Sequence, residues 1–198
     1  MSAPSETFPL RRREVAKALL AERGDMLVVA GLGSTAWDVT AAGDHPLTFP
    51  LWGAMGGAAM IGLGLALARP EQRVLVVTGD GEQLMGLGSL AAIGAKAPSN
   101  LVIVVFDNER YGETGMQPTH TAHGIDLAGI AAACGFPLAG TLREPAELEG
   151  ALPAIRSRPG PIFFDIKVRA EALPFALPPK DGAYLKDRFR SALGLPFS

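Results

Sequence analysis

Val74-Leu75-Val76-Val77-Thr78-Gly79-Asp80-Gly81 is the stretch that decides the fold, because an apolar run typical of a buried strand ends here in a glycine-flanked aspartate. An Asp-Gly pair by itself favours a hairpin turn. The segment that follows, Gln83 to Lys96, is too long for a returning strand, and its apolar residues recur at helical spacing. A strand, a glycine turn and a helix in this order predict a parallel crossover instead of a hairpin.

Asn108 follows the next strand along the chain, which we predict at residues 101–106. An aspartate at the carboxyl end of a buried strand, with glycines that let the backbone approach a ligand, suits an anion held through a hard cation. The side chain of Asn108 can supply a second oxygen to the same ion. Asp80 and Asn108 therefore predict a clamp for magnesium and a diphosphate group.

Apolar, β-prone runs alternate with helical patterns along the whole chain. This order is typical of an α/β fold with three layers, in which a doubly wound, mainly parallel sheet carries helices on both faces. We expect strands at 26–30, 47–50, 73–78, 101–106, 137–140 and 161–168. We expect helices at 9–22, after residue 50, at 83–96, 125–134 and 144–157, and from 181 onward. Ligands of such folds bind outside the carboxyl ends of the strands.

Composition limits the classes of function. The 198 residues are 48% hydrophobic and include 24 glycines, which fits one compact α/β domain spanning 1–198. Eighteen basic and 20 acidic residues give a net charge of -2, without the basic stripe that indicates nucleic-acid binding. Cys134 is the only cysteine, which excludes an intrachain disulfide, a four-cysteine zinc site and a cysteine-bound iron-sulfur cluster. We expect a cytoplasmic protein.

Two segments need a membrane or targeting interpretation. Arg11 to Arg13 are followed by a charged amphipathic helix, so the start of the chain does not resemble a signal peptide. Residues 46–68 carry no charge over 23 positions, which is long enough to span a bilayer. Because Pro46, Pro50 and several glycines interrupt this segment, we expect a buried, closely packed helix. Met1 and the leading helix also lead us to expect that the chain is no arbitrary fragment.

Two further loops contain small residues that a ligand can approach. Residues 31–35, Gly-Leu-Gly-Ser-Thr, offer amides and two hydroxyls to an anion. The alternative is an ordinary strand-to-helix turn with Ser34 or Thr35 as the N-cap. In residues 53–56, Gly-Ala-Met-Gly, Met55 is either a wedge against a ligand or a core filler, and the pattern taken alone favours the core filler.

These motifs together resemble the signature of the thiamine diphosphate enzymes. Gly79-Asp80-Gly81 with Asn108 is similar to their metal-binding signature, and residues 53–56 fall where the family carries a Gly-Ser-Met-Gly-like segment. Residues 111–117, Tyr-Gly-Glu-Thr-Gly-Met-Gln, resemble the Tyr-Gly-Ser-Thr-Gly-Gly-Gln segment of its decarboxylases. The resemblance covers most of the chain and points to the diphosphate-binding domain. Within the family it is strongest to sulfopyruvate decarboxylase beta subunits and to phosphonopyruvate decarboxylases.

The resemblance implies a role for each matching residue. Asp80 and Asn108 would bind Mg²⁺ through their side chains and Arg110 through its backbone carbonyl. Met55 would lie under the thiazolium ring and force the cofactor into its bent form, while the carbonyl of Gly53 would accept a hydrogen bond from the aminopyrimidine. The implied cofactor-binding residues are Ser34, Gly53, Met55, Asp80, Gly81, Glu82, Asn108, Tyr111, Gly112 and Glu113.

Glu82 departs from the decarboxylase pattern, in which a small or hydroxyl residue is commoner at this position. A carboxylate beside a diphosphate is electrostatically unfavourable unless it points away. We therefore expect only the backbone N–H of Glu82 to contact the diphosphate.

The resemblance further implies a thiamine diphosphate and Mg²⁺ dependent decarboxylase subunit acting on a small 2-oxo acid, similar to sulfopyruvate or phosphonopyruvate. In this family an activating glutamate comes from a pyrimidine-binding domain, for which 198 residues leave no room. We therefore expect a hetero-oligomer with a separate alpha subunit. The alternatives are a subunit of another thiamine diphosphate enzyme, such as a carboligase or a split transketolase, and a non-catalytic cofactor-binding module.

The substrate-facing residues are less well defined. Gln117, His120 and His123 follow the predicted metal loop and could face the substrate. His120 is the candidate proton donor, because a histidine titrates near neutrality. The alternative for His120 is a solvated loop histidine. Arg11 to Arg13 could meet a phosphonate or sulfonate, but we expect them on a solvated helix face.

Overall fold

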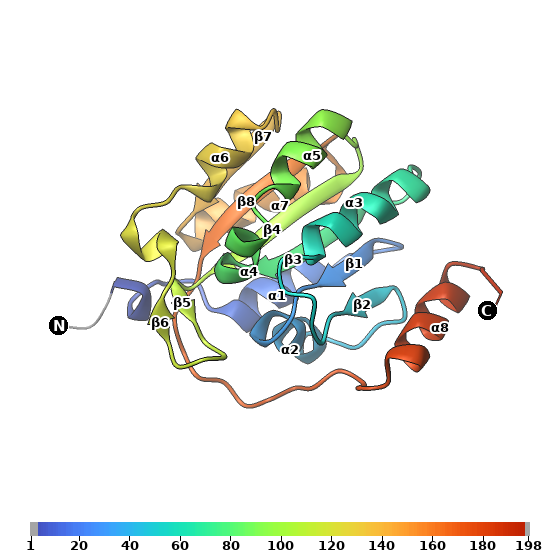
Figure 1. Cartoon of the computed structure of the whole chain (residues 1–198), viewed down its shortest axis with the longest axis horizontal. Coiled ribbons are helices and arrows are strands. Elements are labelled where there is room, and N and C mark those ends of the chain that lie inside the picture. Colours follow the sequence, from blue (N-terminus) through green and yellow to red (C-terminus); the bar gives the residue numbers. More distant parts are fainter. Residues whose placement is uncertain (1–3, 197–198) are drawn as a thin grey trace.

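The computed structural model describes residues 4–196 and contains a parallel sheet between two layers of helices (Figure 1). The strands lie in the order β2-β1-β3-β4-β8-β7, and every neighbouring pair is parallel. Their bounds are β1 Leu27–Ala30, β2 Thr48–Pro50, β3 Val74–Gly79, β4 Leu101–Asp107, β7 Leu138–Leu142 and β8 Ile162–Lys167. The predicted fold class and the predicted crossover after β3 are confirmed.

Helices cover both faces of the sheet, and Phe189 of the terminal helix α8 (Gly182–Ala192) joins the second of the two cores. One core contains residues of α1 (Arg12–Leu20), α2 (Ser34–Ala41) and α7 (Pro145–Ser157), and the other contains residues of α3 (Ala58–Ala68), α5 (Ser89–Lys96) and α6 (Leu127–Ala133). Strand β4 shows why both cores form. Val102 and Val104 contribute to the first core and Ile103 and Val105 to the second, so the strand is apolar from Leu101 to Phe106, as is typical of a parallel strand covered on both faces.

The uncharged segment 46–68 is divided between β2, a loop and α3. Within the part of the chain that the structure describes, no helix has the length and apolar character needed to cross a membrane. Gly62 of α3 lies so close to β3 that a Cβ atom there would be 2.2 Å from Cγ2 of Val76. The expected close packing is therefore found on the side of α3 that faces the sheet, but the expected burial is only partial, because Met60 and Leu67 are exposed.

Two helices differ from the prediction. The helix expected at 83–96 is two helices, α4 (Asp80–Met85) and α5, because a Cβ on Gly86 would lie 2.2 Å from the carbonyl oxygen of Gly56 and the chain turns at this close approach. Helix α2 corresponds to the alternative interpretation of residues 31–35 as a strand-to-helix turn. It begins at Ser34 with Gly33 as its N-cap and no side-chain cap, so the N-cap alternative for Ser34 and Thr35 is wrong.

The connections also hold elements that the pattern did not predict. Beyond β4 the chain forms a short antiparallel hairpin of β5 (Arg110–Tyr111) and β6 (Gln117–Pro118), then the 3-10 turn η2 (His120–His123). Another such turn, η1 (Pro4–Glu6), precedes α1. After β8 an extended segment runs past α2 to the terminal helix α8 (Gly182–Ala192), which lies beside β2 (Figure 1).

Candidate active site

The loops at the carboxyl ends of β1, β3 and β4 enclose a cavity of about 120 Å³. Every residue expected to bind the cofactor lines this cavity except Gly53, and Arg110 lines it as well. Gly53 is exposed, with no atom within 4 Å of a Cβ built on it. The sheet thus brings the predicted residues together because parallel strands end at a common edge.

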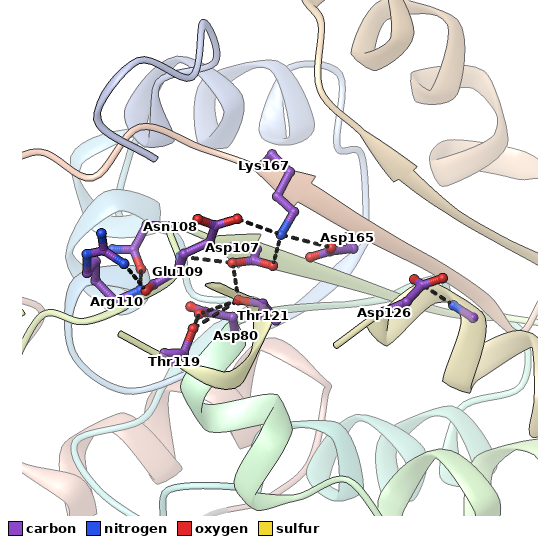
Figure 2. Close-up of polar contacts among 11 residues, drawn as sticks. Asp80, Asp107, Asn108, Glu109, Arg110, Thr119, Thr121, Asp126, Asp165 and Lys167 are labelled. Carbon is purple, nitrogen blue, oxygen red and sulfur yellow. Dashed lines mark hydrogen bonds and ion pairs between the residues drawn. The ribbon is translucent and has the colours of Figure 1, made fainter. Parts of the chain in front are cut away.

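Asp80 is buried at the start of α4, directly after β3 (Figure 2). The hydroxyl of Thr119 donates a hydrogen bond to Oδ2 of Asp80 at 2.6 Å, and the hydroxyl of Thr121 lies 3.3 Å from the same oxygen. Burial, and then the negative charge of Asp107, raise the pKa of Asp80 to about 7, while the two threonines lower it. Among residues 4–196, the ion pairs of the structure do not include Asp80.

Asp107 lies behind Asp80 at the end of β4 and is fully buried. It accepts hydrogen bonds from the hydroxyl of Thr121 at 2.8 Å, from the amide of Glu109 at 2.9 Å and from Nζ of Lys167 at 2.6 Å. Figure 2 shows Lys167 among three carboxylates, with Nζ also 3.3 Å from Oε1 of Glu109 and 3.9 Å from Oδ2 of Asp165. Burial disfavours the charge of Lys167, but Asp107, Asp165 and Glu109 together outweigh that effect and raise its pKa.

Asp165 completes this buried group at the end of β8. Burial, followed by the charge of Asp107, raises its pKa well above the ordinary value. Its protonated form is thereby favoured, which reduces the negative charge packed around Lys167.

Asn108 is buried beside the cavity, and its Oδ1 accepts a hydrogen bond from the amide of Arg110 at 2.9 Å. An amide oxygen has two lone pairs, so one of them stays available to a cation. The guanidinium of Arg110 donates to the carbonyl of Glu109 at 2.9 Å. This contact occupies part of the side chain of Arg110. The group of Arg110 that is expected to bind a metal is its backbone carbonyl.

The carboxylate of Glu82 is turned into the protein. Its Oε2 accepts a hydrogen bond from the hydroxyl of Thr78 at 2.7 Å and packs so closely on Gly31 that a Cβ there would lie 2.0 Å away. Burial raises the pKa of Glu82 against the opposing effect of Thr78 and of nearby backbone amides. Oε1 is buried and has no hydrogen-bond partner among the described residues.

Glu113 reaches the start of α2. Gly33, the N-cap of that helix, has a φ of 70°, and a Cβ built on it would lie 2.9 Å from the carboxyl carbon of Glu113. A carboxylate is electrostatically favoured at a helix N-terminus. Glu113 therefore occupies the space beside Ser34 in which an anionic ligand would otherwise lie.

Met55 lines the cavity with 40% of its surface exposed, so the core-filler interpretation is wrong. Its position is compatible with a wedge against a ligand in the cavity.

Arg12 corrects the expectation of a solvated helix face. It is only 7% exposed, lines the same cavity, and its Nε lies 3.0 Å from Oδ2 of the buried Asp38. Arg13 is partly buried against Asp38, and Arg11 pairs with Glu171. Helix α1 precedes a parallel strand, so its first residues return to the carboxyl edge of the sheet, and this signal could have placed Arg12 at the site.

His120 and His123 lie in η2 with exposed side chains, and neither is among the described residues that line the cavity. Gln117 is held by Thr114 through two hydrogen bonds of 3.0 and 3.1 Å. The sequence pattern instead missed Thr119, Thr121, Asp107 and Lys167. Asp107 and Lys167 could have been predicted, because they lie at the ends of adjacent strands. No sequence pattern near Thr119 and Thr121 indicates a place at the site.

The residues present fit a diphosphate held through Mg²⁺. Residues 4–196 contain no cluster of three or more His, Cys, Asp or Glu side chains arranged to hold a metal. The oxygens of Asp80 and Asn108 are nevertheless the hard donors that Mg²⁺ prefers, and Mg²⁺ typically takes one or two carboxylates and completes its shell with phosphate and water. The amides around Gly81 and Ser34 line the same cavity.

Comparison with known families decides the identity of this domain. Residues 32–166 match the family described as "Thiamine pyrophosphate enzyme, C-terminal TPP binding domain". This chain belongs to that family. The matched range includes every predicted cofactor and metal residue.

Two curated relatives narrow the comparison. The chain is 36% identical to phosphonopyruvate decarboxylase of Streptomyces viridochromogenes over 97% of its own length and 48% of the relative. It is 38% identical to the sulfopyruvate decarboxylase subunit beta of Methanothermobacter thermautotrophicus over 81% of its own length and 83% of the relative. The chain thus spans about half the length of the phosphonopyruvate decarboxylase that it matches.

A solved structure supports the fold. It comes from Mycobacterium smegmatis and is described as a thiamin diphosphate-dependent enzyme. It superposes with a TM-score of 0.70 at 23% sequence identity, covering 82% of this chain and 32% of that one.

Proposed function

We propose that this chain, as a single domain over 1–198, is the beta-type subunit of a thiamine diphosphate and Mg²⁺ dependent decarboxylase. Its substrate would be a small 2-oxo acid of the sulfopyruvate or phosphonopyruvate type. The observation that carries the proposal is the convergence of Asp80, Asn108 and Met55 on one cavity. Relatives named for these two decarboxylases, at 36% and 38% identity, support the substrate class.

In this proposal Asp80, Asn108 and the carbonyl of Arg110 hold Mg²⁺, and Ser34 with the amides near Gly81 and Gly112 binds the diphosphate. Glu82 contributes its backbone N–H, Tyr111 and Glu113 border the same region, and Met55 and the carbonyl of Gly53 orient the cofactor's two rings. When bound, the cofactor supplies the electron sink for loss of CO₂. His120 is the proposed proton donor.

A separate alpha subunit would complete the site. The relative from Methanothermobacter thermautotrophicus is named a subunit beta, and the chain covers 83% of it. Trp52, Met55 and Met116 are exposed on this chain, the two methionines lining the cavity or the one beside it. Exposed apolar side chains around a cofactor cavity favour a partner surface there. The partner would provide the activating glutamate.

The direct experiment is coexpression with a pyrimidine-domain subunit from the same genome, followed by an assay of CO₂ release from sulfopyruvate, phosphonopyruvate and pyruvate. We expect turnover of one of the first two substrates that requires Mg²⁺ and both subunits. Asp80→Ala should abolish Mg²⁺-dependent cofactor binding while the chain stays folded. A well-formed, cofactor-loaded complex without turnover would contradict the decarboxylase proposal and favour a non-catalytic module. Turnover by this chain alone would contradict the two-subunit proposal.

A further inference from the structure

The carboxylate of Asp80 is held from one side only. Oδ2 of Asp80 accepts the hydroxyl of Thr119 at 2.6 Å, and the hydroxyl of Thr121 is 3.3 Å away. Both of these side-chain contacts end on Oδ2, and Asp80 lines the cavity. The engagement of Oδ2 leaves Oδ1 as the oxygen for a cation.

Thr119 and Thr121 have one hydroxyl hydrogen each, and more than two oxygens lie close enough to accept them. Each hydroxyl donates one hydrogen, yet the Thr119 and Thr121 oxygens are also 2.9 Å apart, and Thr121 is 2.8 Å from Oδ1 of Asp107. The two shortest contacts to carboxylates use both hydrogens, one from Thr119 to Asp80 and one from Thr121 to Asp107. Thr119 is therefore the principal donor to Asp80, and Thr121 is the link to the residues behind it.

Asp107 and Thr121 lie between the ammonium group of Lys167 and the carboxylate of Asp80. Lys167 contacts Asp107 at 2.6 Å and Glu109 at 3.3 Å, and Thr121 stands between Asp107 and Asp80 (Figure 2). A cation in direct contact with Asp80 would compete with a metal for its charge. A neutral hydroxyl orients the carboxylate and leaves that charge available.

We infer that Thr119 is a positioning residue that presents Asp80 to Mg²⁺, with Thr121, Asp107 and Lys167 holding Thr119 and Asp80 in register from behind. This inference rests on the proposed function, because it assigns a role to residues around the proposed metal ligand. All four supporting side chains are buried, with exposed fractions of 7% or less, so the arrangement is part of the folded domain. Partners that orient a metal ligand in this way typically contribute 10- to 100-fold to metal affinity.

The test compares Thr119→Val with Thr119→Ser in the assembled two-subunit protein. Valine keeps the size and removes the hydroxyl, whereas serine keeps the hydroxyl. Mn²⁺ is titrated at fixed thiamine diphosphate, and bound Mn²⁺ is measured by electron paramagnetic resonance. We expect Thr119→Val to need about 10-fold or more Mn²⁺ for half-saturation. Thr119→Ser should bind nearly as wild type, and activity of Thr119→Val at saturating metal should return close to the wild-type kcat.

Thr40→Val is the matched control, because it removes a hydroxyl that donates to the carbonyl of Ala36 at 2.7 Å inside α2. It should leave the Mn²⁺ titration unchanged. If Thr119→Val does not fold, Thr121→Val should still raise the Mn²⁺ requirement severalfold.

The outcomes separate the two proposals. A wild-type titration curve in a folded Thr119→Val or Thr121→Val variant would overturn this inference while the proposed function stands. A loss of kcat with an unchanged metal requirement would also overturn it. Failure of the wild-type complex to bind Mn²⁺ with the cofactor would overturn the proposed function and the inference with it.

Discussion

Glu113 is a charged residue in the segment 111–117, and the Tyr-Gly-Ser-Thr segment that this stretch resembles has serine at that place. Here a carboxylate packs over Gly33 at the start of α2 and borders the cavity. A diphosphate bound in this cavity would lie near this negative charge, which is electrostatically unfavourable.

We predict that Glu113→Gln binds thiamine diphosphate about threefold to tenfold more tightly than wild type at fixed Mg²⁺. Removal of one negative charge near an anion is worth about 1 kcal/mol at contact distance in a water-like medium. Isothermal titration at low and high salt measures the effect, which should shrink as salt is added. Glu149→Gln, an exposed change on α7 outside the cavity, is the control. Equal affinity in Glu113→Gln and wild type would show that the carboxylate leaves the diphosphate position freely.

Glu82 gives the domain a specific dependence on pH. Burial raises its pKa in the folded chain above the ordinary value of 4.5, so the folded state keeps a proton that the unfolded state releases. The free energy of unfolding therefore falls as pH rises above about 4.5 and levels off once the folded pKa is passed.

We predict that Glu82→Gln lacks this loss, because glutamine keeps the shape of the side chain and has no proton to release. Urea unfolding of the metal-free chain at pH 5 and pH 8 should show the variant gaining stability relative to wild type at the higher pH. Parallel pH profiles for the two chains would show that Glu82 does not titrate between these values.

Helix α3 contains two glycines, of which one packs against the sheet and the other is exposed. Its sequence is apolar on every side, and its glycines have different surroundings. Gly62 faces β3 where a Cβ would be 2.2 Å from Val76, whereas Gly64 is exposed with no atom within 4 Å of a Cβ position. Close packing against the sheet therefore requires one glycine but not the other.

We predict opposite effects of alanine at these two positions. Gly64→Ala should stabilise the chain by about 0.5–1 kcal/mol, since alanine is the better helix former. Gly62→Ala should destabilise it by about 1–3 kcal/mol, because the stiff side chain of Val76 and the strand behind it must shift. Chemical denaturation of both variants measures the difference. A stabilising Gly62→Ala would mean that α3 can move away from β3 at no cost.

Helices α1, α6 and α7 and all six strands of the main sheet appear within a few residues of their expected places. The longer helices and strands were recognisable because their apolar patterns extend over many residues. The hairpin of β5 and β6 was missed because two-residue strands carry no periodicity. The break between α4 and α5 was missed because it depends on the backbone of Gly56, a distant residue.

At the scale of the whole molecule, the helices and cores serve to bring loops from separate parts of the chain to one edge of the sheet. Residues from the start of α1 to the hairpin after β4 line a single cavity there. The extended segment after β8 returns α8 to the opposite side of the sheet, beside β2 (Figure 1). On its way the segment borders the pocket beside the cavity, through Glu171 and Phe175.

The sequence alone determined the parallel sheet and the meeting of Asp80 with Asn108. The physical reason is general: alternating strands and helices build parallel crossovers, and the carboxyl ends of parallel strands lie at one edge whatever the side chains do. The glycines on both sides of Asp80 let the backbone approach a ligand, and this predicts a ligand site at that edge.

Only the tertiary structure showed that Arg12 is buried, that Glu113 lies over Gly33, and that Thr119 holds Asp80. These contacts join segments far apart in the chain, and they depend on the path of each loop and the packing of each helix. Local patterns of polarity do not encode such paths. The resemblance named the ligands of the proposed metal, but the residues that position them became visible only in the folded chain.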